Sequence, residues 1–417
     1  MKSEIIAVGS EMLTPFRQDT NSLYLTEKLN ELGVTVAFKT IVGDRQKDLI
    51  NAITAALSRV DILVIMGGLG PTEDDLTREA VAETLSLPMH RNATQVAALA
   101  ARAATWRVPM PTNNLKQADL LEGATLLPNP NGSAPGQWLD ITWQEYRKLL
   151  MLVPGPPNEC RPLFDAECMP RLREILPERH IAKRVLRAAM IPESQADKLL
   201  APIYTEYKDV ETTILAKAGD IQLTLLCSKS NAAVAQQRVD ELAGRMEGVL
   251  EDWLYSSGGE SSESLEQIVL YYLGLRQATL AVAESCTGGM IAQRITSVPG
   301  SSRSFLGGAV VYSDELKTAF AGVPPNLITE CGAVSREVAE ALAFGIRRNT
   351  GASIGLGVTG IAGPTGGTEL KPVGFVHIAL SDAQKTDSIE RAFRGDRQRI
   401  REWTTQQALD LIRRRLR

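Results

Sequence analysis

The segment TLAVAESCTGG (residues 279–289) decides how the last third of the chain folds. Its first five residues form an apolar run typical of a buried strand, and Gly288 and Gly289 permit a tight turn. A strand that ends in such a turn before a helix is a common place for a reactive hydroxyl or thiol. Ser285 and Cys286 lie at that point, so the segment predicts an α/β domain with a nucleophile at a strand end.

The first third of the chain repeats this alternation. Apolar segments at 4–8, 34–38 and 61–66 predict strands, and amphipathic segments at 20–33 and 44–57 predict helices between them. This order is typical of a parallel sheet covered by helices on both faces. After residue 123 the segments TLL, QWLDI and LLMLV predict a hairpin and a final strand.

The middle of the chain has a different order, strand–helix–strand–strand–helix, which predicts a small α+β module, ferredoxin-like or KH-like. The Ser- and Gly-rich segment at 255–263 indicates a linker or a helix entry. We therefore expect two three-layer α/β domains, 1–170 and 258–417, joined by the module 178–254. The basic end RRRLR (413–417) is typical of a solvent-exposed last helical turn.

Composition narrows the class of protein. The 45 Lys and Arg against 49 Asp and Glu give a net charge of −4, so direct nucleic-acid contact is not expected. Five cysteines without metal-site spacing indicate a reducing cytosol and no zinc site. The N-terminus is too acidic and its apolar run too short for a signal peptide, and no run reaches membrane-spanning length. We expect a cytoplasmic protein with no membrane partner.

Two glycine-rich segments follow predicted strands. The formal GxGxxG at 355–360 lacks the following helix that a dinucleotide site requires, because the loop IAGPTGGTELKPVG comes next. That loop has backbone amides that could cradle an anion. The second segment, MGGLGPTEDDLT (66–77), places Asp74 and Asp75 at the start of the next predicted helix, where they would either bind a ligand or interact only with the helix dipole.

Acidic and polar side chains follow several strands of the first third: Glu11, Asp19, Asn21, Asp74, Asp75 and Glu159. The carboxyl ends of parallel strands meet at one edge of a sheet, where ligands bind. Oxygen ligands gathered there suit Mg²⁺ or a similar divalent ion that holds a diphosphate.

The first 165 residues resemble a known domain. GGLGPTEDDLT, with GSEM and DTN before it and NPNGSAPG and PGPPNE after it, resembles the molybdopterin-binding-like domain of the competence/damage-inducible CinA family. The resemblance implies an ADP-ribose pyrophosphatase that depends on Mg, Mn or Co, with potassium a further candidate. It implies metal ligands Glu11, Asp19, Asp74 and Asp75, and substrate contacts Gly67, Gly68, Gly70, Thr72 and Asn21. Pro15 stands where the family has a glycine, which leaves the loop shape and the substrate preference open.

The last block resembles the C-terminal CinA domain, which also occurs alone as the nicotinamide mononucleotide deamidase PncC. The shared motifs are AESCTGG (283–289), PGSS (299–302), GGAVVYSDELK (307–317), GAVS (332–335), VTGIAGPTGGTELKPVG (358–374) and GDR (395–397). The resemblance implies hydrolysis of nicotinamide mononucleotide to nicotinate mononucleotide and ammonia without a cofactor. It implies Ser285 as nucleophile with Tyr312 and Lys317.

Amide hydrolysis needs a nucleophile, a base that returns its proton to the leaving ammonia, and an oxyanion site. A lysine can serve as base, with a tyrosine as proton relay. If a helix follows Ser313, Lys317 lies about one turn beyond Tyr312, so both can face one cleft. The alternative is a helix lysine whose amine reaches solvent. His377 lies in the apolar segment GFVHIAL and is expected to be a core residue.

The neighbours of Ser285 have alternative roles. Adjacent side chains at a strand end point in opposite directions, so we expect Cys286 to be buried, with a thiolate nucleophile as the alternative. Thr287, Gly288 and Gly289 are expected to offer amides to an oxyanion or phosphate. The remaining substrate contacts implied are Gly360, Gly363, Gly366, Gly367 and Arg397. Arg397 would clamp a phosphate, or else be a surface arginine.

Together the two resemblances imply a bifunctional enzyme of pyridine-nucleotide recycling that acts on nicotinamide mononucleotide and ADP-ribose, and we expect a homodimer. Two other classes stay open. In the first, the N-terminal domain only binds a pterin or nucleotide. An assay for metal-dependent release of AMP from ADP-ribose would distinguish this binding from turnover. Alternatively, the chain would be a non-catalytic partner in DNA uptake or repair, which a salt-dependent DNA-binding assay would decide.

Overall fold

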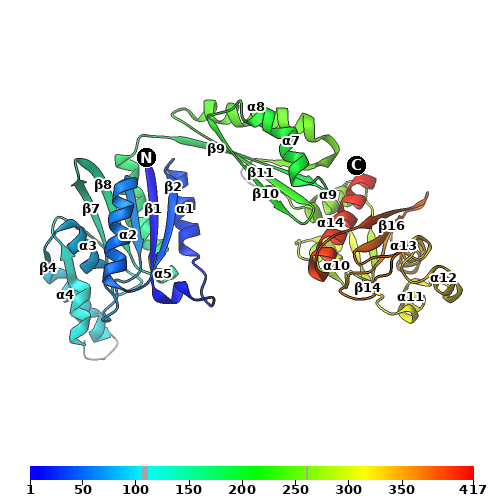
Figure 1. Cartoon of the computed structure of the whole chain (residues 1–417), viewed down its shortest axis with the longest axis horizontal. Helices are drawn as coiled ribbons and strands as arrows, with labels where there is room; N and C mark the ends of the chain where they lie inside the picture. The colour runs from blue at the N-terminus through cyan, green and yellow to red at the C-terminus, as the bar shows by residue number, and fades with distance from the viewer. Residues whose placement is uncertain (106–110, 260–261) are drawn as a thin grey trace. The chain divides into compact units, whose positions relative to one another are not determined.

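The computed structural model describes residues 1–105, 111–259 and 262–417 (Figure 1). The chain forms two compact units, Met1–Ile181 with Ser228–Ala232, and Ala182–Cys227 with Ala233–Arg417. Among the described residues, no helix combines the length and the apolar character needed to cross a bilayer.

The first unit contains a six-stranded sheet in the order β2-β1-β3-β8-β7-β6. The four strands from β2 to β8 are parallel, and β7 and β6 are antiparallel, which confirms the predicted hairpin and final strand. The strands are β1 (Lys2–Val8), β2 (Thr35–Val42), β3 (Ile62–Met66), β6 (Thr125–Leu127), β7 (Gly136–Trp143) and β8 (Tyr146–Val153). A separate small sheet pairs β4 (Met89–Arg91) with β5 (Asp119–Leu121).

Helices cover both faces of the large sheet, as predicted. Alternate residues of β1 point to opposite faces, so Ile5 packs in one apolar cluster with Leu25, and Ile6 packs in another with Leu49. The helices are α1 (Asn21–Glu31), α2 (Gln46–Arg59), α3 (Thr77–Leu85), α4 (Ala93–Thr105), α5 (Pro157–Leu163) and α6 (Met169–Ile175).

The second unit begins with the small α+β module. Its elements are β9 (His180–Ala189), α7 (Glu193–Tyr204), β10 (Val210–Lys217), β11 (Asp220–Lys229), α8 (Ala232–Leu250) and β12 (Leu254–Gly258). The sheet order β10-β11-β9-β12 in a βαββαβ chain is the ferredoxin-like arrangement. The linker expected at 255–263 is wrong in its first part, because Leu254–Gly258 pairs antiparallel with β9 and buries Tyr255.

The rest of the second unit is a three-layer α/β domain with a sheet in the order β14-β13-β15-β16-β17. Strands β14, β13 and β15 are parallel, and β16 and β17 are antiparallel. The elements are α9 (Leu265–Leu275), β13 (Leu280–Glu284), α10 (Met290–Thr296), β14 (Phe305–Val310), α11 (Asp314–Ala321), α12 (Pro325–Cys331), α13 (Arg336–Thr350), β15 (Ile354–Gly360), β16 (Phe375–Ser381), β17 (Thr386–Ala392) and α14 (Arg397–Leu416).

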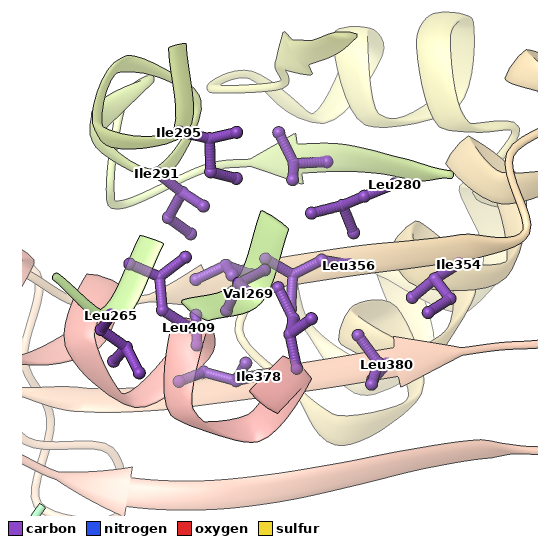
Figure 2. Packing of buried hydrophobic residues seen from close by; sticks show 14 of the residues in the cluster. Leu265, Val269, Leu280, Ile291, Ile295, Ile354, Leu356, Ile378, Leu380 and Leu409 are labelled. Carbon is purple, nitrogen blue, oxygen red and sulfur yellow. The ribbon is translucent and has the colours of Figure 1, made fainter. Parts of the chain in front are cut away.

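One apolar cluster forms the larger core of this domain. Leu280 and Leu356 of the sheet meet Val269 of α9, Ile291 of α10 and Leu409 of α14 (Figure 2). A smaller cluster on the other sheet face contacts α11 and α13. The predicted three-layer class is therefore confirmed for this block.

The glycines of the formal GxGxxG lie inside β15. A Cβ at Gly355 would lie 2.1 Å from the carbonyl oxygen of Ala343, and one at Gly357 would lie 2.4 Å from that of Ala339. These glycines let α13 pack closely on the sheet. As predicted, the motif is not a dinucleotide loop.

The basic C-terminus differs from the expectation of a solvent-exposed turn. Arg413 is only 1% exposed. Its guanidinium pairs with Asp410 at 2.8 Å and donates to the carbonyls of Asp252 at 2.6 Å and Leu254 at 3.3 Å. A buried charge requires such partners, and here they join α14 to the ferredoxin-like module.

Candidate active sites

The turn after β13 presents Ser285 at the ends of three parallel strands. The Ser285 amide donates to Val358 O of β15 at 3.0 Å, and the Val311 amide donates to Glu284 O at 2.8 Å. Gly288 (φ +59°) and Gly289 (φ +90°) then reverse the chain into α10. The predicted strand–turn–helix is confirmed, and Ser285 is 8% exposed at its corner.

Glu284 holds this turn, and sequence reasoning missed it. Its carboxylate is 1% exposed and accepts hydrogen bonds from the amides of Gly289 at 3.0 Å, Ile291 at 3.1 Å and Ala292 at 2.8 Å. A carboxylate at this place satisfies the unpaired amides of a helix start and suits its dipole. The Gly289 amide therefore binds Glu284 and, contrary to the expectation, is not open to a ligand. An acid between an apolar strand and a glycine turn is the signal that could have revealed it.

Arg401 of α14 fixes the other side of the turn. Its guanidinium donates to the carbonyl of Thr287 from Nε at 3.2 Å and from Nη2 at 2.8 Å. The Thr287 side chain is fully buried, and its Oγ1 has no partner among the described residues. The Gly288 amide is also engaged, donating to Ser285 O at 3.1 Å. The side chain of Thr287 thus points into the protein and away from solvent.

Cys286 is buried, as predicted. It is 4% exposed and packs in the large apolar cluster of the domain. Burial raises the pKa of its thiol to about 12, so the thiol stays protonated at neutral pH. Because the thiolate is the reactive form, this burial disfavours Cys286 as the nucleophile.

Arg397 links two loops beside this turn. Its Nη2 donates to the Tyr312 hydroxyl at 2.6 Å, and its Nη1 donates to Gly363 O at 2.7 Å. Tyr312 is 57% exposed at the end of β14. The side chain of Arg397 is therefore ordered by two contacts, which differs from a free surface arginine.

The glycine-rich loop after β15 carries the other predicted contacts. A Cβ at Gly360 would lie 2.4 Å from Val376 Cγ1, whereas Gly363 (φ +77°) and Gly366 (φ +88°) have left-handed backbones. A Cβ at Gly367 would lie 2.8 Å from the Val373 amide nitrogen. These glycines are required by the fold of the loop, whose tip at 364–370 is exposed.

Lys317 is buried, not solvent-exposed. It is 2% exposed, and its Nζ donates to Asp314 Oδ1 at 2.9 Å. In the described part of the chain, no hydrogen bond joins the side chains of Ser285, Tyr312 and Lys317. The three residues follow the neighbouring strands β13 and β14 but are not in direct contact.

His377 is a core residue, as expected. It lies in β16, is 5% exposed, and packs edge-on against Phe375 with 5.0 Å between ring centroids. Burial lowers the pKa of its imidazole below the usual value, which favours the neutral form.

The second candidate site is the glycine-rich loop after β3. Gly67 (φ +97°) and Gly68 (φ +66°) turn the chain sharply. Thr77 Oγ1 donates to Gly67 O at 2.8 Å. The buried Arg78, which sequence reasoning missed, donates to Leu69 O at 2.9 Å and Gly70 O at 3.0 Å. The loop is thus held from inside by its own helix α3.

Asp74 and Asp75 lie in this loop, before α3, which begins at Thr77. The expectation that they start the helix is therefore wrong. Asp75 Oδ2 accepts from the Thr72 amide at 2.9 Å, and a Cβ at Gly70 would lie 2.3 Å from the same oxygen. Asp74 is exposed, and a hydrogen bond from Thr72 holds the pKa of its carboxyl below the usual range.

The remaining predicted ligands make local contacts. Asp19 accepts from the Ser22 amide at 2.9 Å at the start of α1, and Glu11 lies in an exposed 3-10 turn. Asn21 is 4% exposed, donates to Gly155 O at 2.8 Å and accepts from Arg161 at 3.3 Å. Within the described ranges, no three acidic, His or Cys side chains are arranged to hold a metal ion. The role of Glu11, Asp19, Asp74 and Asp75 as metal ligands therefore stays a prediction.

The fold is that of an α/β protein with two three-layer α/β domains, a ferredoxin-like module and glycine-rich loops at strand ends. Residues 262–416 match the family model "CinA C-terminal domain", and residues 4–174 match "Probable molybdopterin binding domain". The chain belongs to the CinA family.

Full-length relatives support this assignment. The chain is 64% identical to a CinA-like protein of Acidobacterium capsulatum and 54% identical to one of Koribacter versatilis, each over all of both chains. Among solved structures, it is similar to a competence/damage-inducible protein of Agrobacterium tumefaciens, with 36% identity over 35% of this chain and 90% of that chain, and a TM-score of 0.35.

Replacing Glu284 tests how the serine turn is held. Glu284→Ala leaves three amides without their acceptor, so we expect it to lower the free energy of unfolding of the second unit by about 2–4 kcal/mol in urea titrations. The exposed Glu315→Ala should change it by less than about 0.5 kcal/mol. Equal losses in the two variants would mean that the carboxylate does not hold the turn.

Proposed function

We propose that the C-terminal domain hydrolyses the amide of nicotinamide mononucleotide to give nicotinate mononucleotide and ammonia, with no cofactor. The observation that carries the proposal is Ser285, 8% exposed at a glycine turn that Glu284 and Arg401 hold, after the strand next to the one that leads to Tyr312 and its partner Arg397. The family membership of the chain and the burial of Cys286 support the same assignment.

In this proposal Arg397 and the glycine-rich loop receive the substrate phosphate, because a guanidinium and backbone amides both favour anions. Ser285 Oγ attacks the carboxamide carbon. In this proposal the amide of Cys286, which donates to no backbone carbonyl among the described residues, stabilises the developing oxyanion. The serine proton passes through Tyr312 to Lys317 and then to the leaving nitrogen.

The C–N bond breaks and ammonia leaves, which gives a nicotinate ester on Ser285. Water then attacks this ester and releases nicotinate mononucleotide, and the proton returns to Ser285. For the relay to work, Lys317 must exchange its contact with Asp314 for one with Tyr312. Lys317 lies at the buried end of this path, and Tyr312 lies at its exposed end.

Kinetics of variants test the serine mechanism. Ser285→Ala and Lys317→Met should each lower kcat for ammonia release by about 10³-fold or more, and the double variant should lose little further, because one catalytic unit acts non-additively. Cys286→Ala and the exposed Ser297→Ala should stay within about threefold of wild type, since neither side chain takes part in the reaction. An active Ser285→Ala enzyme beside an inactive Cys286→Ala enzyme would instead identify a thiol hydrolase.

For the N-terminal domain we propose ADP-ribose, or a related diphosphate, as the substrate, with a divalent metal and with AMP and ribose 5-phosphate as products. The exposed carboxylate of Asp74 on the Arg78-supported glycine loop carries this proposal. Because no protein-built metal site is present among the described residues, the ion would arrive with the diphosphate.

Charge-neutral variants of this loop test the second activity. Asp74→Asn should lower metal-dependent AMP release from ADP-ribose by at least about 100-fold, because a carboxylate near a metal–diphosphate supplies charge that an amide cannot. Ammonia release from nicotinamide mononucleotide should stay unchanged in this variant. Asp48→Asn, an exposed acid of α2, is the control. If the wild-type chain binds ADP-ribose but releases no AMP, the N-terminal domain is a binding domain and the proposed cleavage is wrong.

A further inference from the structure

A cavity of about 940 Å³ lies between the ferredoxin-like sheet and helices α9, α10 and α14. It belongs to neither candidate active site. Its wall on α14 includes Gln398, Glu402, Trp403 and Gln406. At 100° per residue, Trp403 and Gln406 lie on the face opposite Arg397 and Arg401, which contact Tyr312 and Thr287, and Gln398 and Glu402 lie between the two faces. One helix therefore has the serine site on one face and this cavity on the other.

Two fixed aromatic side chains line the cavity. Trp403 stacks on Phe393 with 5.8 Å between ring centroids. Tyr255 is 8% exposed, and its hydroxyl donates to Asp220 at 2.7 Å. Ordered aromatic rings in a concave site suit a planar ring of a ligand.

A buried donor in the cavity wall has no acceptor. Gln406 is 2% exposed, and its Oε1 accepts from Arg294 Nη1 at 2.8 Å. Because arginine only donates, this contact fixes the amide with Nε2 as the remaining donor. Nε2 has no partner among the described residues, and the buried Nε of Arg187 has none either. Buried donors of this kind lower stability unless a ligand or water accepts from them.

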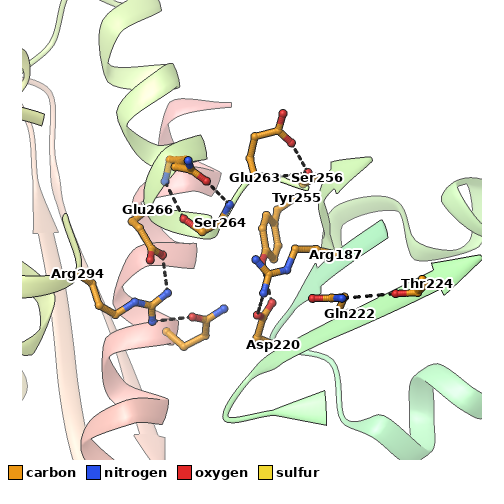
Figure 3. A network of polar contacts seen from close by, with 12 residues as sticks. Arg187, Asp220, Gln222, Thr224, Tyr255, Ser256, Glu263, Ser264, Glu266 and Arg294 are labelled. Carbon is orange, nitrogen blue, oxygen red and sulfur yellow. Dashed lines mark hydrogen bonds and ion pairs between the residues drawn. The ribbon is translucent and has the colours of Figure 1, made fainter. Parts of the chain in front are cut away.

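The wall carries four basic and five acidic side chains, and two of the carboxylates are paired with arginines. Figure 3 shows Arg187, Asp220 and Tyr255 on the module facing Arg294 and Glu266 on the C-terminal domain. Asp220 pairs with Arg187 at 2.7 Å, and Glu266 pairs with Arg294 at 2.6 Å, so both carboxylates are neutralised.

Two further carboxylates of the wall are also engaged. Asp396 accepts from the Arg399 amide at 2.8 Å, and Glu402 accepts from Gln398 at 2.8 Å. The cations Lys217 and Arg399 are exposed at the edge of the cavity, with Glu193 as a third exposed charge. The cavity thus combines fixed rings, unpaired donors and two cations at its mouth.

We propose that this cavity binds a mononucleotide. The base lies against Tyr255 and Trp403, an oxygen or ring nitrogen accepts from Gln406 Nε2, and the phosphate contacts Lys217 and Arg399. A ligand here contacts α14, whose Arg397 and Arg401 bind Tyr312 and Thr287. The binding claim itself does not depend on the proposed reaction.

Calorimetric titration of the full chain with AMP and with nicotinate mononucleotide tests this site. At least one of the two should bind. That binding should weaken at least tenfold in Gln406→Glu, which keeps the oxygen that faces Arg294 and replaces the free donor by an acceptor. Lys217→Glu, at an exposed position that cannot disturb the core, should weaken it by a similar factor. Lys208→Glu, exposed on the same module, is the matched control and should bind as wild type does.

Two background variants separate this site from the other two. The same binding should persist in Arg397→Gln, which removes the proposed phosphate contact of the serine site, and in Asp74→Asn, because neither residue lines the cavity. If neither proposed reaction takes place, the measured binding of the nucleotide at this cavity is still valid. Absence of binding by either nucleotide, or binding that is unchanged in both Gln406→Glu and Lys217→Glu, would overturn the proposal.

Discussion

The candidate site of the second unit depends on one interaction at the start of α10. There the carboxylate of Glu284 accepts hydrogen bonds from three backbone amides. β13 can end and α10 can begin within a few residues because this buried charge satisfies the helix start. Ser285 lies between the carboxylate and the helix, so its position depends on these bonds. Arg401 completes the turn from α14 by binding Thr287 O. The nucleophile is therefore placed by backbone contacts on both sides.

Much of the architecture follows from local sequence patterns. Apolar runs that end in glycine predicted the parallel strands, the serine turn and the buried Cys286, because strand alternation and tight turns act over a few residues. The edge strand β12 was not predicted, since it depends on pairing with β9, some seventy residues earlier in the chain. The burial of Arg413 depends on the carbonyls of Leu254 and Asp252, which lie 159 and 161 residues earlier in the chain. Such long-range contacts leave no local signature.

In the candidate sites, too, some features could be predicted from the sequence and others could not. The family resemblance implied Ser285, Tyr312 and Arg397, and in the structure Ser285 and Tyr312 follow neighbouring strands while Arg397, at the start of α14, donates to Tyr312. The sequence did not show which carboxylates would accept hydrogen bonds from backbone amides close to them in the chain. Asp19 and Asp75 each accept from a residue three positions away, as short acidic side chains in turns commonly do. A carboxylate with such contacts is indistinguishable by sequence from a metal ligand. Glu284 is the converse case, in which an acid inside a motif supports the fold of the site.

The account depends most directly on a covalent bond between Ser285 and the acyl group of nicotinamide mononucleotide. Acid quenching of the wild-type chain within its first turnover, followed by peptide mass mapping, measures this bond. The account predicts a nicotinate mononucleotide ester on Ser285 that disappears once the substrate is consumed. An adduct on Cys286, or first-turnover product from a chain of unchanged mass, would contradict it.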